Sequence, residues 1–251
     1  MLRCLEAVQP LTRELLAWIN GQLKKALPGY CAFCRISVPG GVPWCDDCFA
    51  DMPWNHGACT LCAEPLPMAL VASSTSRQCG RCLRQPPAQS AAWVPLRYEA
   101  RMMRLIQRYK FSADARAGEV LIQLMLASLN RPSELGEALV AVPGQHDRTR
   151  EQGFDHTAWL TRRLADRLKL PVIEAERLRE TPSQRGLDRI SRRRNVKRAF
   201  GVAQPLPPAV VVVDDVMTTG ATLESLAAAC RNAGAKRVTA VAFARTPSAR
   251  I

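Results

Sequence analysis

A valine run followed by two carboxylates and a threonine–glycine turn is the feature of this 251-residue chain with the clearest chemistry. The segment VVVV, 210–213, predicts a strand buried on both faces, with Asp214 and Asp215 directly after it. The turn TTG, 218–220, then leads into a predicted helix. Backbone N–H groups in such a turn and at a helix N-terminus bind phosphate, and paired carboxylates accept hydrogen bonds from vicinal ribose hydroxyls. The pattern therefore predicts a sugar-phosphate site.

Gly220 has a specific part in this prediction, because a residue without a Cβ permits a close approach of the ligand and unusual backbone angles. A simpler interpretation of the same residues is an acidic turn that only caps a helix. That interpretation leaves the combination of two adjacent carboxylates with the TTG turn unexplained. We therefore favour the phosphate loop.

Eight of the ten cysteines form four CxxC pairs before residue 83. The pairs are Cys31/Cys34, Cys45/Cys48, Cys59/Cys62 and Cys79/Cys82. Each pair offers two thiolates from a tight turn, and two pairs complete a closed, structural Cys4 zinc site. Two zinc ions are therefore expected. Pairing in sequence order gives two ribbons, although the spacing is also compatible with interleaved pairs. Redox-active pairs would need a CxxC that opens a helix after a strand, a context that the sequence does not show.

The positive charge of the chain lies mainly in its second part. The formal net charge is +13, of which residues 91–251 contribute a surplus of eleven cations and residues 1–90 a surplus of two. Zinc-loaded Cys4 sites would make the cysteine-rich part net negative, since each brings four thiolates for one divalent ion. We therefore expect anions to bind the second part, and the ribbons to act as a scaffold or docking element.

The composition divides the chain into three segments. We predict an N-terminal amphipathic helix within residues 1–28, a double zinc-ribbon domain over 29–90 and an α/β domain over 91–251. Predicted strands (91–98, 138–143, 171–178, 210–215, 237–244) alternate with predicted helices (101–109, 117–129, 156–169, 223–232). Valine-rich strands between helices indicate a mostly parallel sheet with flanking helices. Ligands bind such sheets at the carboxyl ends of strands, here after Pro143 and Val213.

Neither a secretory signal nor an apolar run long enough for a membrane span is visible in the sequence. We therefore expect a cytoplasmic protein without a membrane span. In that reducing compartment, closely spaced cysteines bind metal more often than they form disulfides.

The motif order resembles one known family. VVVVDDVMTTG resembles the phosphoribosyl pyrophosphate (PRPP) motif of type I phosphoribosyltransferases. Together with the CxxC ribbons, YEARMMRLIQRYKF, VAVPGQHDRTREQGFDH and TPSQRGLDRISRRRNVKRAF, the chain is similar to the ComF family, also called competence protein F or GntX-like. The resemblance begins near residue 28 and implies a type I phosphoribosyltransferase-like fold behind a zinc-ribbon domain.

The resemblance also implies positions for PRPP and Mg²⁺. The acids Asp214 and Asp215 match ribose-binding residues. The residues matching the 5′-phosphate loop are Thr218, Thr219, Gly220 and Thr222. Candidates for contact with the pyrophosphate are Arg148, Arg150 and Lys110. The segment 152–156 departs from the family's usual RGFNQ-like string, so no role is carried over there.

A basic segment matches the mobile hood that covers the site in the family. Its cations, which suit a diphosphate or a nucleic-acid backbone, are Arg189, Arg192, Arg193, Arg194, Lys197 and Arg198. The resemblance implies a PRPP-binding protein of DNA uptake that handles incoming single-stranded DNA together with uptake-machinery proteins. The alternative is a phosphoribosyltransferase that acts on an unidentified small-molecule acceptor. No segment identifies a catalytic residue or an acceptor pocket.

Overall fold

A computed structural model of the chain describes residues 29–73, 77–129, 135–144, 155–179, 181 and 189–248, and positions 15, 18, 19 and 22 before them. The chain forms two compact units, Met1–Met52 and Pro53–Ile251. The predicted N-terminal helix lies almost wholly outside the described residues.

The described part of the first unit is a small hairpin followed by a helix. Strands β1 (Gly29–Tyr30) and β2 (Ser37–Val38) pair antiparallel, and helix α2 (Asp46–Ala50) follows. Cys31, Val38 and Cys48 form its buried centre, with Trp44 packed against them. So small a core cannot hold a domain together by burial alone, which is why metal ligation is expected to support it.

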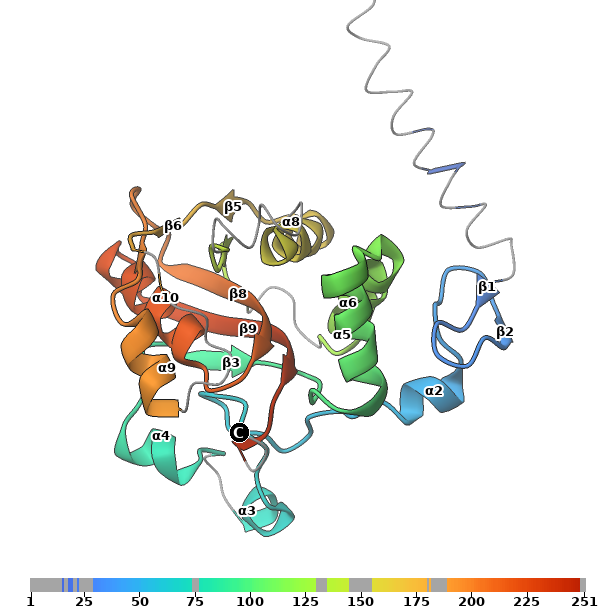
Figure 1. Cartoon of the computed structure of the whole chain (residues 1–251), viewed down its shortest axis with the longest axis horizontal. Helices are drawn as coiled ribbons and strands as arrows, with labels where there is room; N and C mark the ends of the chain where they lie inside the picture. The colour runs from blue at the N-terminus through green and yellow to red at the C-terminus, as the bar shows by residue number, and fades with distance from the viewer. Residues whose placement is uncertain are drawn as a thin grey trace, which may run out of the picture. The chain divides into compact units, whose positions relative to one another are not determined.

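The second unit is built around a five-stranded parallel sheet, which confirms the predicted fold class (Figure 1). The strands are β3 (Ala91–Trp93), β4 (Ala138–Ala141), β5 (Val172–Ile173), β8 (Ala209–Met217) and β9 (Arg237–Arg245). Their order is β3-β9-β8-β4-β5, so the valine strand β8 lies in the middle. Residues 210–213 are at most 1% exposed, as expected for a strand covered on both faces.

Helices cover both faces of this sheet. On one face, α8 (His156–Leu168) packs against β4 and β8, α6 (Ala115–Ala127) contacts α8, and α5 (Ala100–Ser112) contacts α6. On the other face, α10 (Ala221–Asn232) packs on β8 and β9, and α9 (Arg189–Val196) packs on α10 (Figure 1). The short strands β6 (Glu176–Arg177) and β7 (Phe200–Gly201) form a separate antiparallel pair.

Local sequence signals explain the ends of these elements. The carboxylates of Asp114 and Asp155 accept hydrogen bonds from N–H groups in the first turns of α6 and α8. Gly234, at φ +104°, follows the end of α10. The predicted strand 91–98 is regular only as far as Trp93, because Pro95 cannot donate to a ladder.

The second cysteine segment belongs to the larger compact unit. It contains the short helices α3 (Met68–Ser73) and α4 (Gly80–Arg84). The division of the chain at residue 90 stays a prediction about domains. Among the described helices, none has the length and the apolar character to cross a membrane.

Candidate functional site

The two carboxylates predicted to bind ribose lie at the carboxyl end of β8, where the strand still pairs with β9. Asp215 forms an ion pair with Lys110 of α5, with 2.6 Å between Oδ2 and Nζ. Asp214 Oδ1 accepts a hydrogen bond from the N–H of Asp215. The structure therefore brings together three of the predicted site residues, from segments about one hundred positions apart in the sequence.

Burial and charge change the protonation of this group. Burial, and then the neighbouring charge of Asp215, raises the pKa of Asp214 to about 7. Burial alone would lower the pKa of Lys110, but the Asp215 carboxylate outweighs it, so this pKa lies above its ordinary value. Lys110 therefore stays protonated and offsets one of the two negative charges.

The predicted phosphate loop connects β8 to α10. Gly220 is the N-cap of α10 and has φ +80°, a left-handed conformation that favours glycine. The Thr219 hydroxyl accepts a hydrogen bond from the N–H of Ala221. Thr222 lies in the first turn of α10. The loop thus places four predicted residues around a helix N-terminus, an arrangement suited to an anion.

A buried contact between α5 and α8 holds Lys110 in place. The carbonyl of Lys110 lies 2.6 Å from Nε2 of His156, and the hydroxyl of Tyr109 donates to the carbonyl of His156. Burial lowers the pKa of His156. Asp155, at the N-terminus of the same helix, accepts a hydrogen bond from the N–H of Gly144 after β4. Asp155 and His156, to which the sequence assigned no role, thus position the end of α5 and the start of α8.

The basic hood segment begins with α9, which is fastened to α10. Arg193 forms two hydrogen bonds with the carboxylate of Glu224, at 2.8 and 2.9 Å, and a third with Gln85. Ser225 donates to the carbonyl of Val196. Arg193 therefore has a structural partner, whereas Arg194, Lys197 and Arg198 are exposed.

Several predicted residues cannot be placed. Arg148 and Arg150 lie outside the described residues, and the side chains of Arg189 and Arg192 are likewise not described. Their assigned contacts with pyrophosphate or DNA stay predictions.

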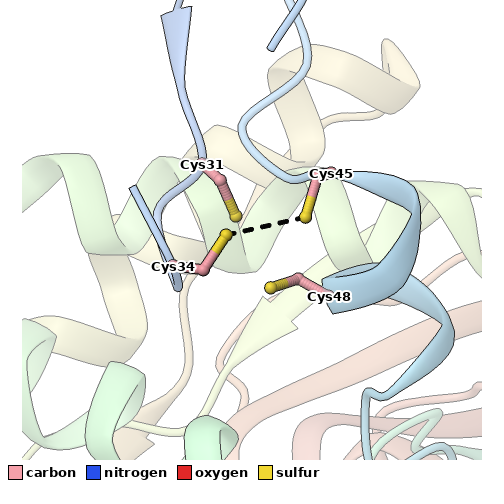
Figure 2. A group of neighbouring side chains, drawn as sticks. All are labelled: Cys31, Cys34, Cys45 and Cys48. Carbon is pink, nitrogen blue, oxygen red and sulfur yellow. Dashed lines mark hydrogen bonds between the residues drawn. The ribbon is translucent and has the colours of Figure 1, made fainter. Parts of the chain in front are cut away.

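The first two CxxC pairs converge from two segments (Figure 2). Cys31 and Cys34 come from the turn after β1, and Cys45 and Cys48 from the start of α2. Their sulfur atoms all lie within 4.8 Å of one another. Cys59, Cys62, Cys79 and Cys82 form a second such group. The groups follow sequence order, so the structure selects the two-ribbon arrangement over the interleaved one.

The two groups are copies of one local structure. In the first copy, the N–H of Cys31 donates to the carbonyl of Ile36, and the N–H of Arg35 donates to that of Cys31. In the second copy, the N–H of Cys59 donates to the carbonyl of Glu64, and the N–H of Ala63 donates to the carbonyl of Cys59. Both Arg35 and Ala63 have positive φ. A helix of five residues follows Cys45 in one copy and Cys79 in the other.

The sulfur positions fit zinc. The distance is 3.7 Å between the sulfurs of Cys34 and Cys45 and 3.6 Å between those of Cys62 and Cys79. Four sulfurs about 2.3 Å from a tetrahedral zinc ion would lie about 3.8 Å apart. Burial raises the pKa of Cys48 and of Cys82 to about 12, so a cation is needed to hold four thiolates together.

A buried arginine that the sequence analysis did not single out lies behind the phosphate loop. Arg245 ends β9 and is 0% exposed. It donates hydrogen bonds to the carbonyls of Met217, at the end of β8, and Thr218, in the loop, and to the carboxylate of Glu64 in the second cysteine segment. The signal that could have identified it is a lone cation at the end of an apolar strand, RVTAVAFAR.

A cavity of about 830 Å³ opens at the carboxyl ends of β4 and β5. Val142, Ile173 and Trp159 supply apolar walls. The charged residues of the lining are Arg162, Arg177, Asp155, Glu174 and Glu176. The volume is in the range of small-molecule sites.

Comparisons with known proteins agree with this arrangement. Residues 23–83 match the family described as Double zinc ribbon domain, and residues 188–251 match the Phosphoribosyl transferase domain. The chain is 28% identical to Competence protein F of Haemophilus influenzae over 237 residues, 90% of this chain and 94% of that protein. It is 29% identical to DNA utilization protein YhgH of Escherichia coli K12 over 88% of this chain and 98% of that protein. These findings confirm the predicted resemblance.

Similarity to solved structures is lower. Orotate phosphoribosyltransferase from Aeropyrum pernix aligns with 57% of this chain and 64% of its own, at 23% identity and a TM-score of 0.36.

We expect two zinc ions per chain, because each cysteine group supplies four thiolates. Replacing Cys45 by serine should leave one ion and unfold the first ribbon, since structural zinc supplies much of the folding energy of such a unit. Elemental analysis of the purified protein measures the stoichiometry. Wild-type protein without zinc would contradict the assignment.

We also expect stability to depend on the protonation of Asp214. Its pKa of about 7 exceeds that of an unfolded aspartate, about 4, so the folded chain holds an extra proton between these pH values. The contribution of Asp214 to the free energy of unfolding is therefore fully present below about pH 4 and is lost as the pH rises through about 7. Between pH 6 and 8 the free energy of unfolding should fall by about 1 kcal/mol more in wild type than in Asp214→Asn.

Urea unfolding at each pH measures this difference, with the zinc content verified throughout. Asp166→Asn, which removes an exposed carboxylate of α8, is the control. Parallel pH profiles of wild type and Asp214→Asn would refute the raised pKa.

Proposed function

We propose that this chain is a PRPP-binding protein that handles single-stranded DNA during DNA uptake. It joins a double zinc ribbon to a phosphoribosyl transferase domain, as ComF-like proteins do. The observation that carries this proposal is the carboxyl end of β8, where two carboxylates precede a left-handed glycine and the N-terminus of α10. The names of the relatives, Competence protein F and DNA utilization protein, support the biological setting. The many cysteine thiolates suit the reducing cytosol.

The proposed PRPP site uses the loop for the 5′-phosphate and the acids for the ribose. The first-turn N–H groups of α10 and the positive end of its dipole favour a phosphate dianion. Asp214 and Asp215 accept hydrogen bonds from the ribose hydroxyls, which requires ionised carboxylates. Mg²⁺ would neutralise charge on the diphosphate.

Lys110 is the nearest described cation to these acids. In the ligand-free chain its ammonium group bonds to Asp215, so ribose hydroxyls would compete with it for the carboxylate. Displaced from Asp215, the ammonium group is free to meet the diphosphate. This exchange reconciles its present partner with the pyrophosphate role that the family resemblance implies.

The proposed DNA contact is the exposed basic surface beside α9. Arg194, Lys197 and Arg198 lie there, and Arg179 holds the end of the helix by donating to the carbonyls of Asn195 and Lys197. A fixed row of cations can follow a phosphate backbone without reading its sequence. Binding would therefore depend strongly on salt.

A second candidate function is phosphoribosyl transfer to a small molecule. It is favoured by the cavity of about 830 Å³ at the carboxyl ends of β4 and β5. The proposed PRPP site lies at the carboxyl end of β8, on the same side of the sheet. Transfer would require an acceptor there, within reach of the ribose carbon that loses pyrophosphate. Release of pyrophosphate from PRPP in the presence of candidate acceptors tests this function.

We expect Asp214→Asn/Asp215→Asn to weaken PRPP binding. Each lost hydrogen bond to a charged group is worth about 1.5–3 kcal/mol, so the dissociation constant should rise by about 100-fold or more. Calorimetry with PRPP and Mg²⁺ measures it, and Asp166→Asn should bind as wild type does. If the double variant and the wild type bind PRPP equally, the ligand lies elsewhere.

We expect Arg194→Gln/Lys197→Gln to weaken binding to single-stranded DNA and to flatten its salt dependence. Two lost phosphate contacts reduce the slope by about 1.4 units, at about 0.7 per contact. The control, Lys169→Gln/Lys236→Gln, removes the same charge from exposed positions that precede the amino ends of β5 and β9. Equal slopes for both double variants would show that net charge alone matters and would exclude this surface.

A further inference from the structure

Arg245 is a fully buried cation at the end of a buried strand. Its guanidinium group carries five N–H donors, and each donor that finds no acceptor is costly away from water. The described contacts of Arg245 go to two different parts of the second unit, the phosphate loop and the second cysteine segment.

On the loop side, one nitrogen of the guanidinium serves several backbone carbonyls. Nη1 donates to the carbonyl of Met217 at 3.1 Å and also to those of Thr218 and Thr246. The N–H of Thr246 donates to Met217 as well, at 2.9 Å. The start of the loop is therefore anchored from behind.

On the cysteine side, Arg245 holds the turn between Cys59 and Glu64. Nε donates to the carbonyl of Cys62 at 3.1 Å, and Nη2 lies 2.5 Å from the Glu64 carboxylate. Glu64 in turn accepts hydrogen bonds from the N–H and the hydroxyl of Ser248, each at 2.7 Å. The carboxylate that balances the buried cation thus comes from the metal-binding turn.

Successive carbonyls of this turn are all engaged by the rest of the unit. Thr60 accepts from the N–H of Ala92, and Leu61 from the side chain of Gln89, at 2.7 and 2.8 Å. Ala63 accepts from the side chain of Asn55 at 2.9 Å. The position of the turn is therefore defined residue by residue against the edge of the sheet.

A second arginine connects the same two regions. Arg81 lies on α4, between Cys79 and Cys82, and its Nη1 is 3.5 Å from the carbonyl of Thr219. The side chain of Arg81 also forms a hydrogen bond with the Cys62 sulfur. One guanidinium thus lies between the sulfur cluster and the phosphate loop.

The direction of these carbonyls determines where the loop's N–H groups point. In a planar trans peptide, the C=O of one residue and the N–H of the next point in opposite directions. Carbonyls of Met217, Thr218 and Thr219 that face Arg245 and Arg81 therefore turn the next N–H groups, those of residues 218–220, toward the other side. That side is the one from which an anion would approach.

We propose that Arg245 and the second cysteine group position the phosphate loop, so that zinc at Cys59, Cys62, Cys79 and Cys82 is required for anion binding by residues 218–222. Zinc at the first cysteine group is not required for anion binding. The ligand-binding half of this inference depends on the proposed PRPP function, but the ordering of the loop does not.

The two ribbons supply a matched pair of variants. Cys45 and Cys79 occupy the same place in the two copies: each is half-buried and is the N-cap of a five-residue helix. Cys45→Ser and Cys79→Ser should each lose one zinc ion. Amide hydrogen exchange is measured without ligand at Ala221, Glu224 and Thr246, whose N–H groups donate to the Thr219 hydroxyl and to the carbonyls of Gly220 and Met217. Exchange at these three amides should accelerate about tenfold or more in Cys79→Ser and stay within about twofold of wild type in Cys45→Ser.

Exchange in β4, residues 138–141, reports whether the sheet itself remains folded. If Cys79→Ser unfolds the sheet, Arg245→Gln and Arg81→Gln decide the question with zinc retained. Both should accelerate exchange at Ala221, Glu224 and Thr246. The control Arg231→Gln should not, because Arg231 bonds to Ala88, Ser90 and Lys236 and has no described contact with the loop.

PRPP titration of the same variants separates the two proposals. Loop-disordering variants should bind PRPP at least about tenfold more weakly, while Cys45→Ser and Arg231→Gln bind as wild type does. If wild-type protein does not bind PRPP, the proposed function fails and hydrogen exchange still tests the coupling. Equal exchange at Ala221, Glu224 and Thr246 in Cys45→Ser and Cys79→Ser, or in Arg245→Gln and Arg231→Gln, overturns the coupling.

Discussion

The hydrogen-bond requirement of one buried guanidinium organises the described half of the site. Arg245 cannot be hydrated at the end of β9, so its donors must find protein acceptors and its charge must find a carboxylate. The acceptors include the carbonyls of Met217, at the end of β8, and Thr218, in the loop, and the carboxylate belongs to Glu64. As a result, the end of the sheet, the phosphate loop and the second metal-binding turn form one hydrogen-bonded structure, and none of the three can move without leaving a buried polar group unpaired.

The same strand that supplies an apolar centre also carries the most polar group of the site. β8 is buried along its valines and then presents Asp214 and Asp215 at its carboxyl end, beside the N-terminus of α10. Two carboxylates so close together cannot both ionise easily, and Lys110 relieves only one of them. The α5–α8 contact through His156 keeps that lysine in reach. A ligand with hydroxyl groups and a phosphate complements both the acids and the helix terminus.

Sequence patterns predicted the elements of the sheet well because buried parallel strands and amphipathic helices have different periodicities, and each is visible locally. The exceptions also have local causes, such as Pro95, after which the first strand does not continue regularly. The hood was predicted as a group of equivalent cations, but the structure distinguishes them. Arg193 is bound by Glu224, while Arg194 is exposed. That difference depends on the packing of α9 against α10, which no charge count contains.

The sequence by itself determined which chemical groups exist and which must act together locally: eight thiols in CxxC turns, two carboxylates at the end of a valine strand, and a glycine where the backbone turns left-handed before α10. Such features depend on residues within one turn or one strand, so spacing is sufficient to recognise them. The tertiary structure decided how distant groups combine. It paired the cysteines in order, placed Lys110 on Asp215, and joined Arg245 to both the loop and Glu64. Those contacts join residues from 11 to 181 positions apart, and only the packing of the chain brings them together.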